Sequence, residues 1–170
     1  MDRLPLADAL AAAEKIKAAL APLCDRIDIA GSIRRKRPLC GDIDIVCLPR
    51  PGKLAHIHAF CHDLGDVAKS GKQYVMVNFD GDTQLDLWFA HHEVSGDPCN
   101  YGAIFLTRTG SISHNIKIVE RAKQLGLRYH PHKGVMHGER VVASAEEADI
   151  FKALNMAFVA PELREVGGGK

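Results

Sequence analysis

The chain has 170 residues, of which 46% are hydrophobic and 25% are charged, a composition typical of a globular protein that can form a core. Its formal net charge is +1, which is low for a protein that coats duplex DNA. Any contact with nucleic acid must therefore come from local basic patches or metal ions. No apolar run approaches the roughly 18 residues of a membrane-spanning helix. No charged-then-apolar signal peptide opens the chain either, so we expect no membrane association.

The cysteines argue against a disulfide framework. They number five, an odd count without a CxxC pair. We therefore expect free thiols and a reducing, cytoplasmic or other intracellular compartment. These cysteines are Cys24, Cys40, Cys47, Cys61 and Cys99.

The first half of the chain predicts helices alternating with short strands. The expected elements, in chain order, are a helix over 5–21, a strand over 26–32 that runs into a turn at Gly31 and Ser32, a strand over 41–48, a helix over 53–64 closed by Gly65, and two strands, 72–79 and 83–90. Asp80, Gly81 and Asp82 separate the last two strands, which indicates a hairpin.

The second half predicts a smaller lobe. A connection over 95–102 leads to a helix over 111–125 ended by Gly126, short strands within 127–142, and a last helix from Ser144 with capping-box spacing. We therefore expect one domain over 1–97, a second over 98–166, and a disordered tail over 167–170.

Two aspartates, Asp42 and Asp44, lie in the apolar run GDIDIVCL. On a strand they point to one face while Ile43 and Ile45 point into the core. Carboxylates this close repel each other unless a proton or a cation lies between them, and Mg²⁺ prefers such oxygen ligands. Asp86 has the same apolar context, so three carboxylates would converge if its strand neighbours the first. The alternative is that Asp42 and Asp44 face solvent on a half-exposed strand.

The residues before these aspartates suit a phosphate. Gly31 and Ser32 offer backbone amides and a hydroxyl in a turn, and Arg35 can donate charge-assisted hydrogen bonds to phosphate oxygens. The basic run 34–37 could instead be a solvated loop or a localisation signal. Its place between Gly31-Ser32 and the aspartates favours the phosphate interpretation.

Together these motifs resemble the nucleotidyltransferase superfamily of DNA polymerase beta. The segments TGSISHNIKIVERAKQLGL (109–127) and LNMAFVAPELRE (154–165) are similar to the C-terminal nucleotide-binding lobe of family X DNA polymerases, especially the bacterial branch. The resemblance implies an α/β (α+β) fold, with a palm of mixed sheet and helices over 1–97 and a small C-terminal α/β lobe. The chain resembles the minimal viral members, without the usual lyase or phosphoesterase domains, and the resemblance implies a bacterial or viral origin. Met1 and the position of the first helix favour a complete chain.

The resemblance also implies residue roles. Asp42, Asp44 and Asp86 would bind two Mg²⁺ ions, with Mn²⁺ as a substitute, and Asp86 would help deprotonate the primer 3′-hydroxyl. The residues implied to contact the nucleotide are Gly31, Ser32, Arg35, Cys40, Gly41, Thr107, Arg108, Gly110, Ser111 and Asn115. Those implied to contact DNA are Lys69, Lys72, Gln84 and His114. Thr107 and Arg108 stand where the family usually has aromatic residues against the sugar, which predicts relaxed sugar selectivity.

The function implied is a DNA-directed DNA polymerase that adds dNTPs to a primer on a template or in short gaps during repair, acting as a monomer. A template-independent terminal or minimal nucleotidyltransferase is the first alternative. A non-catalytic subunit that binds DNA ends is the second, and the intact carboxylates and Gly31-Ser32 disfavour it. The low net charge predicts weak, salt-sensitive DNA binding.

Overall fold

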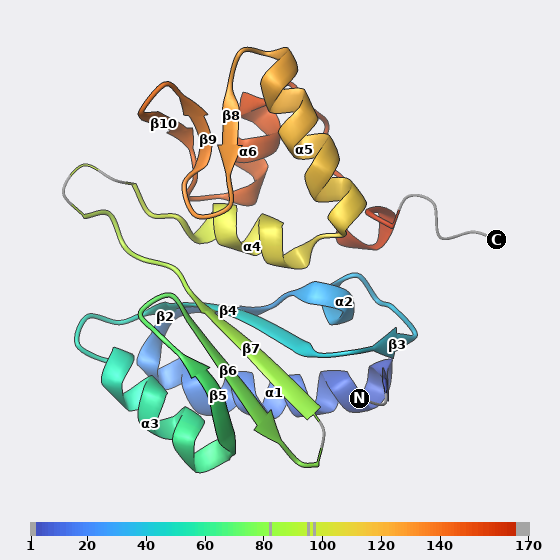
Figure 1. Cartoon of the computed structure of the whole chain (residues 1–170), viewed down its shortest axis with the longest axis vertical. Helices are drawn as coiled ribbons and strands as arrows, with labels where there is room; N and C mark the ends of the chain where they lie inside the picture. Colours follow the sequence, from blue (N-terminus) through green and yellow to red (C-terminus); the bar gives the residue numbers. More distant parts are fainter. Residues whose placement is uncertain (1–2, 82, 95, 97, 166–170) are drawn as a thin grey trace. The chain divides into compact units, whose positions relative to one another are not determined.

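The computed structural model describes residues 3–81, 83–94, 96 and 98–165. The chain forms two compact units that divide between Ala90 and His91 (Figure 1). This division lies a few residues before the predicted boundary between 97 and 98. The predicted tail over 167–170 and Asp82 of the predicted hairpin turn lie outside the described residues.

The first unit is built around a five-stranded mixed sheet with the strand order β2-β4-β7-β6-β5. Its strands are β2 (Cys24–Ile29), β4 (Ile43–Pro49), β5 (Asp66–Ser70), β6 (Tyr74–Phe79) and β7 (Thr83–Phe89). The central strands β4 and β7 are parallel, and the other neighbouring pairs are antiparallel. The expected mixed sheet is therefore confirmed. Strand β4, which carries Asp44 and follows Asp42, is the neighbour of β7, which carries Asp86.

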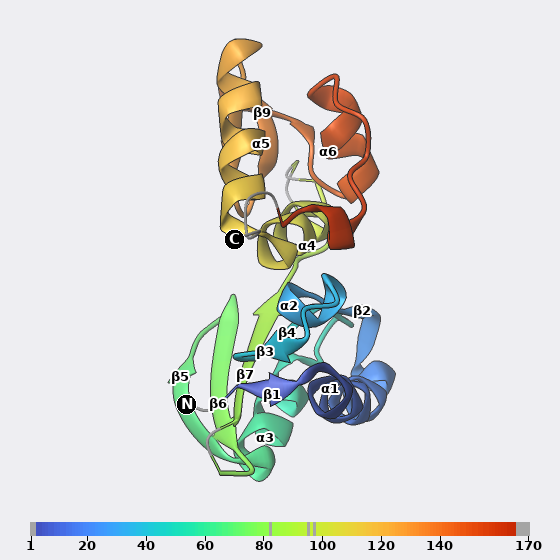
Figure 2. The same ribbon diagram turned by 90° about the vertical axis from the view of Figure 1, so that its right-hand side faces the viewer.

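Two helices, α1 (Leu6–Leu20) and α3 (Leu54–Leu64), cover one face of this sheet (Figure 2). In α1 the buried side chains recur every three or four residues, which is the pattern of a helix with one apolar face. These buried side chains are Ala9, Ala13, Ile16 and Leu20. Because side chains alternate along a strand, the opposite face of the sheet is the one that carries the polar residues.

Short elements connect β2 to β4. The one-turn helix α2 (Gly31–Arg34) follows β2, and β3 (Leu39–Cys40) pairs with β1 (Leu4–Pro5) before the chain enters β4. A 3-10 turn, η1 (Ala21–Leu23), joins α1 to β2. Gly31 and Ser32 therefore begin a helical turn rather than lying in the simple turn expected from the sequence.

The second unit packs three helices on a small antiparallel sheet. Its elements are α4 (Tyr101–Thr109), α5 (Ile112–Gln124), β8 (Arg128–His130), β9 (Gly134–His137), β10 (Arg140–Ala143), α6 (Glu147–Ala153) and the 3-10 turn η2 (Pro161–Leu163). The strand order is β10-β9-β8. Leu106 of α4, Ile118 of α5, Val135 of β9 and Phe151 of α6 share the core. The α+β class expected from the sequence is confirmed.

Two longer elements are absent from the sequence-based prediction. The edge strand β5 was not predicted, and neither was α4, in which seven of the nine residues are buried. A helix that is buried all round shows no amphipathic period, so its sequence lacks the usual helical signal. Gly102 is needed at its start because a Cβ there would collide with the backbone of Glu146.

The last helix, α6, begins at Glu147 and not at Ser144, so the predicted capping box is wrong. The carbonyl of Ser144 instead accepts a hydrogen bond from the amide of Ala103, and that of Ala145 accepts one from Gly102. These residues join the end of β10 to the start of α4. Among the described residues, no helix is long and apolar enough to cross a membrane.

Candidate active site

Asp44 and Asp86 are aligned residues on the neighbouring parallel strands β4 and β7. Both are half-buried, and each lies between two fully buried residues on its strand. These flanking residues are Ile43 and Ile45 beside Asp44, and Leu85 and Leu87 beside Asp86. The predicted separation of the carboxylates from the apolar side chains is therefore confirmed, and the aspartates lie on the polar face of the sheet.

Asp42 is half-buried in the bend immediately before β4. Burial raises the pKa of its carboxyl, the negative charge of Asp86 raises it further, and the positive charge of Arg35 lowers it. A carboxyl responds in this way to charges that lie close to it. Asp42 is thus within electrostatic reach of a carboxylate on another strand and of the arginine predicted to bind phosphate.

Asp86 is held by two side-chain donors. The hydroxyl of Tyr74 donates to its Oδ1 at 2.8 Å, and Nε2 of Gln84 donates to the same oxygen at 2.7 Å. Tyr74 also stacks on Trp88, with ring centroids 4.1 Å apart and planes inclined by 27°. Gln84, which was predicted to contact DNA, therefore contacts a candidate catalytic carboxylate.

Gly31 brings the start of α2 against Asp44. Its φ is +58°, and a Cβ at this position would collide with Oδ2 of Asp44. The amide of Ala30 donates to the carbonyl of Asp44 at 2.8 Å, which fixes the same approach through the backbone. The next side-chain oxygen, Oγ of Ser32, is buried and has no hydrogen-bond partner among the described residues. A buried hydroxyl of this kind suits a ligand with hydrogen-bonding oxygens.

The loop between α2 and β4 contains the remaining predicted residues of this half of the site. Cys40 is buried, and its thiol donates to the carbonyl of Arg37 at 3.7 Å. Gly41 is exposed and has open space at its Cβ position. Cys40 therefore supports the loop from inside, whereas Gly41 lies on its surface.

The donor chemistry of the three aspartates fits a hard divalent cation, because all supply carboxylate oxygens and Asp42 lies in the field of Asp86. Within the described residues, however, no group of three or more His, Cys, Asp or Glu side chains is placed to hold an ion together. Oδ1 of Asp86 is engaged by Tyr74 and Gln84. The convergence of Asp42, Asp44 and Asp86 on one point and their roles as metal ligands stay predictions.

Lys69 and Lys72 are exposed on and after the edge strand β5. Their position leaves both ammonium groups accessible to a polyanion. Their contact with DNA stays a prediction.

In the second unit, Ser111 caps the N-terminus of α5. Its Oγ accepts a hydrogen bond from the amide of His114 at 3.3 Å and donates to the carbonyl of Arg164 at 2.6 Å. Gly110, with a φ of +69°, makes the turn between α4 and α5. The predicted residues Gly110 and Ser111 thus form one corner, which the C-terminal segment supports.

Asn115 lies one turn further along α5. Its Nδ2 donates to the carbonyl of Thr107 at 2.8 Å, and its Oδ1 is buried without a hydrogen-bond partner among the described residues. Oγ1 of Thr107 lies 2.9 Å from the hydroxyl of Tyr129. Arg108 is half-buried beside Thr107. The structure therefore brings Thr107, Arg108 and Asn115 together around the end of α4.

His114 is a correction to the predicted DNA contacts. It is 3% exposed, and its ring centroid lies 5.7 Å from that of Phe151. Burial, followed by the positive charge of Arg164, lowers its pKa to about 4. A buried imidazole that is neutral at pH 7 cannot offer a charge to a phosphate. His114 is a core residue of the second unit.

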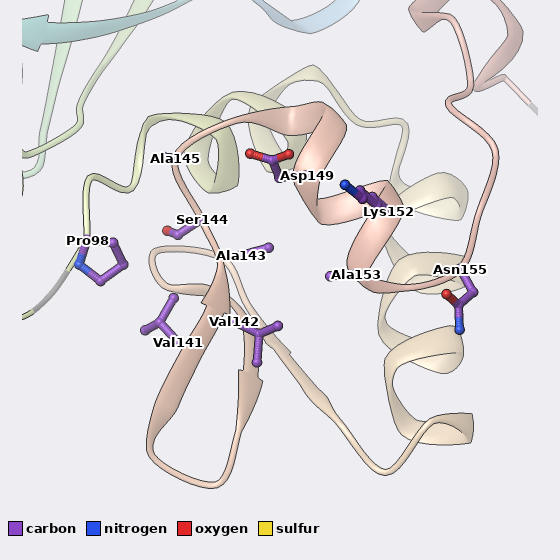
Figure 3. Close-up of a pocket in the computed structure, with 10 residues that line it drawn as sticks. All are labelled: Pro98, Val141, Val142, Ala143, Ser144, Ala145, Asp149, Lys152, Ala153 and Asn155. Carbon is purple, nitrogen blue, oxygen red and sulfur yellow. The ribbon is translucent and has the colours of Figure 1, made fainter.

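The second unit carries hollows beside α6 and along α5. One, of about 620 Å³, lies between β10 and α6 and contains none of the predicted site residues (Figure 3). The other, of about 370 Å³, follows one face of α5 and includes Asn115. Its lining includes Ile112 and Ile116, which are 81% and 52% exposed. Sequence reasoning missed these two residues as site neighbours, although their helical spacing from Asn115 could have indicated them.

Comparisons with known proteins identify similar sequences and structures. Residues 104–165 match the family model for the DNA polymerase beta thumb. DNA polymerase/3′-5′ exonuclease PolX of Bacillus subtilis (strain 168) is 27% identical over 173 residues, which cover 98% of this chain and 29% of that protein. The resemblance to family X DNA polymerases is confirmed. The chain spans less than a third of the length of this relative.

Two solved structures of Leishmania infantum polymerase beta share the fold. Its ternary P/T complex matches with a TM-score of 0.77 and 18% identity, covering 96% of this chain and 77% of the other. Its ternary gap complex matches with a TM-score of 0.80 at the same identity, covering 96% and 71%. A fold similar to that of polymerase beta therefore extends over both units.

Proposed function

We propose that this chain is a DNA-directed DNA polymerase that adds dNTPs to the 3′-hydroxyl of a primer. The observation that carries the proposal is the in-register pair Asp44 and Asp86 on the polar face of the sheet, with Asp42 in the field of both Asp86 and Arg35. Carboxylates beside a phosphate-binding cation are the groups that phosphoryl transfer requires. The family X resemblance and the fold of the polymerase beta complexes support the choice of DNA as the partner.

The proposed reaction is a nucleotidyl transfer. The primer 3′-oxygen attacks the α-phosphorus of the dNTP, the bond from that phosphorus to the bridging oxygen breaks, and pyrophosphate leaves. Asp86 accepts the hydroxyl proton, and Ser32 and Arg35 bind the pyrophosphate oxygens. Asp42, Asp44 and Asp86 would hold two Mg²⁺ ions, or Mn²⁺, which activate the attacking oxygen and stabilise the leaving phosphates.

Nucleotide selection would fall to the second unit. Asn115 is held against Thr107 by a hydrogen bond and retains a buried acceptor, Oδ1, for the nucleotide. Thr107 has a short side chain that is tied to Tyr129, so no aromatic ring at this position excludes a ribose 2′-hydroxyl. We therefore propose relaxed sugar selectivity, with Gly110 and Ser111 forming the rest of this surface.

Short-gap repair synthesis by a monomer in a reducing compartment is the biological setting that we propose. Lys69 and Lys72 would contact the DNA backbone. Binding would be weak because the net charge is only +1, and it would fall further as salt screens these contacts. All five cysteines are free thiols, which fits a reducing compartment.

A primer-extension assay tests the function. Gapped, blunt and single-stranded DNA would be offered with dNTPs or rNTPs and either Mg²⁺ or Mn²⁺. We expect extension on gapped and primed templates and its loss in Asp86→Ala. Extension without a template would favour the terminal-transfer alternative. DNA binding without extension under every condition would favour a non-catalytic DNA-end-binding subunit and defeat the polymerase proposal.

A further inference from the structure

The carboxylate of Asp86 is restrained on one side. Tyr74 and Gln84 donate to the same oxygen, Oδ1, at 2.8 and 2.7 Å, and no described residue donates to Oδ2. An aspartate side chain rotates readily about its last bond, so its two oxygens are not otherwise distinguished. Two donors on one oxygen fix that rotation and leave the other oxygen for a further partner.

The register of the hairpin places both donors on the face that carries Asp86. Gln84 precedes Asp86 by two residues on β7, so both side chains point the same way. On β6, Met76 is the residue opposite Asp86, and Tyr74 is opposite Trp88. Tyr74 therefore reaches diagonally across the strand pair to the carboxylate, a distance that a long aromatic side chain spans.

Trp88 fixes the ring of Tyr74. The two rings stack with centroids 4.1 Å apart, and Trp88 lies on the same face of β7 as Asp86. This stacking limits the positions of the Tyr74 hydroxyl. Trp88 is thus linked to Asp86 through Tyr74, by one ring contact and one hydrogen bond.

We propose that Tyr74 and Gln84 are positioning residues for Asp86. They hold Oδ1 so that Oδ2 is directed to the cation and the primer hydroxyl, and they act only through Asp86. This inference rests on the proposed function, because it assigns Asp86 the role given above. Groups that orient a metal-binding side chain in this way typically contribute about 10- to 100-fold in metal affinity or activity.

Tyr74→Phe is the most direct test, since it removes the hydroxyl and keeps the ring that stacks on Trp88. We expect kcat for primer extension to fall about 10-fold or more, with the KM for primed DNA unchanged. Asp28→Asn is the control: Asp28 lies on β2 of the same sheet and pairs with Arg26 at 3.3 Å and with Lys17 at 4.0 Å, so this variant weakens side-chain contacts of the sheet that do not involve Asp86. It should retain the activity of the wild type.

A cation titration gives a readout that does not depend on turnover. Trp88 is the only tryptophan of the chain, and its emission should be quenched as Mn²⁺ binds near Asp86. In Tyr74→Phe we expect the midpoint of quenching to move to about 10-fold higher Mn²⁺. A residue that only stabilised the sheet would lower the melting temperature without moving this midpoint.

Gln84→Leu provides a second variant in case Tyr74→Phe does not fold. It should show the same fall in kcat and the same shift in midpoint. If both variants bind Mn²⁺ and extend primers as the wild type does, the inference is overturned. If the wild type extends no primer but binds Mn²⁺ more tightly than Tyr74→Phe, the proposed polymerase function fails while the positioning role stands. A wild type that neither binds Mn²⁺ nor extends a primer overturns both.

Discussion

The two units hold their candidate site residues in opposite ways. In the first unit, strand alternation puts the carboxylates Asp44 and Asp86 on one face and the core on the other. In the second unit, Ser111 belongs to the predicted nucleotide surface and also caps α5 and bonds the carbonyl of Arg164. In the sheet, the candidate catalytic side chains are different from those that form the core. At the corner formed by Gly110 and Ser111, one side chain has both a candidate functional role and a structural role. Substitutions should therefore affect the two units differently.

The largest effect should come from the buried ion pair of the second unit. Nη1 of Arg164 donates to Glu147 at 2.7 Å, and the guanidinium lies over the rings of Phe151 and Phe158. Glu147→Gln leaves a fully buried positive charge without its counter-ion, which typically costs about 3–5 kcal/mol. Urea denaturation would measure the loss.

The matched control for Glu147→Gln is Asp149→Asn. Asp149 lies on the same helix but is exposed, so its loss should change the unfolding free energy by less than about 1 kcal/mol. Equal effects of the two variants would show that the ion pair does not anchor the C-terminal segment.

Gly31→Ala should produce the next largest effect, and it tests the separation seen in the sheet. A Cβ at a φ of +58° is strained, and here it would also collide with Asp44. We expect a loss of about 2–4 kcal/mol in unfolding free energy and a loss of primer extension.

Gly52→Ala separates the two causes of that loss. Gly52 has a φ of +76° and nothing within 4 Å of its Cβ position, so this variant has the backbone strain without the collision. It should cost about 1–2 kcal/mol and keep activity. Equal losses of stability and activity in the two variants would mean that Gly31 is needed only for its backbone conformation.

The sheet of the first unit was easier to predict from the sequence than the helices of the second unit. Asp42, Asp44 and Asp86 were predicted to share a face because side chains alternate along strands with a period of two residues. That prediction required the strand of Asp86 to be the neighbour of the strand that contains Asp44, and β4 and β7 are neighbours. Tyr74 could have been found by aligning the predicted hairpin strands, which pairs Tyr74 with Trp88. Its hydrogen bond to Asp86 depends on side-chain rotamers, which the sequence pattern does not specify.

The second unit shows fewer sequence patterns from which its structure could be predicted. α4 is buried on nearly all sides, so it lacks an amphipathic pattern. Arg164 and Ser111 are 53 residues apart, and nothing in the local sequence indicates their contact. His114 was grouped with the predicted DNA contacts, but neighbouring residues on a helix point in different directions, and the side chain of His114 is buried. Long-range packing determined how these residues of the second unit are placed.

The pH dependence of stability should follow His114. Burial lowers its pKa to about 4 from an ordinary value of 6.5, so the unfolded chain binds a proton between these values that the folded chain does not. Stability is therefore full above pH 6.5 and falls as the pH drops toward 4, by up to about 3 kcal/mol. Denaturation at pH 7 and pH 4.5 should show a smaller difference for His114→Leu than for the wild type. The same difference in both proteins would mean that other groups control the acid sensitivity.

The smallest predicted loss of stability concerns Ser111, where candidate function and stability meet in one side chain. Ser111→Ala removes the cap of α5, which typically costs about 1 kcal/mol, together with the hydrogen bond to Arg164. Denaturation and the KM for dNTP should therefore both change, because the corner that presents Asn115 loosens. Asp86→Asn offers the comparison from the sheet: we expect it to abolish extension with little change in stability. If Ser111→Ala lowers stability and leaves the KM for dNTP unchanged, the cap supports the fold alone, and the two units differ less than their construction implies.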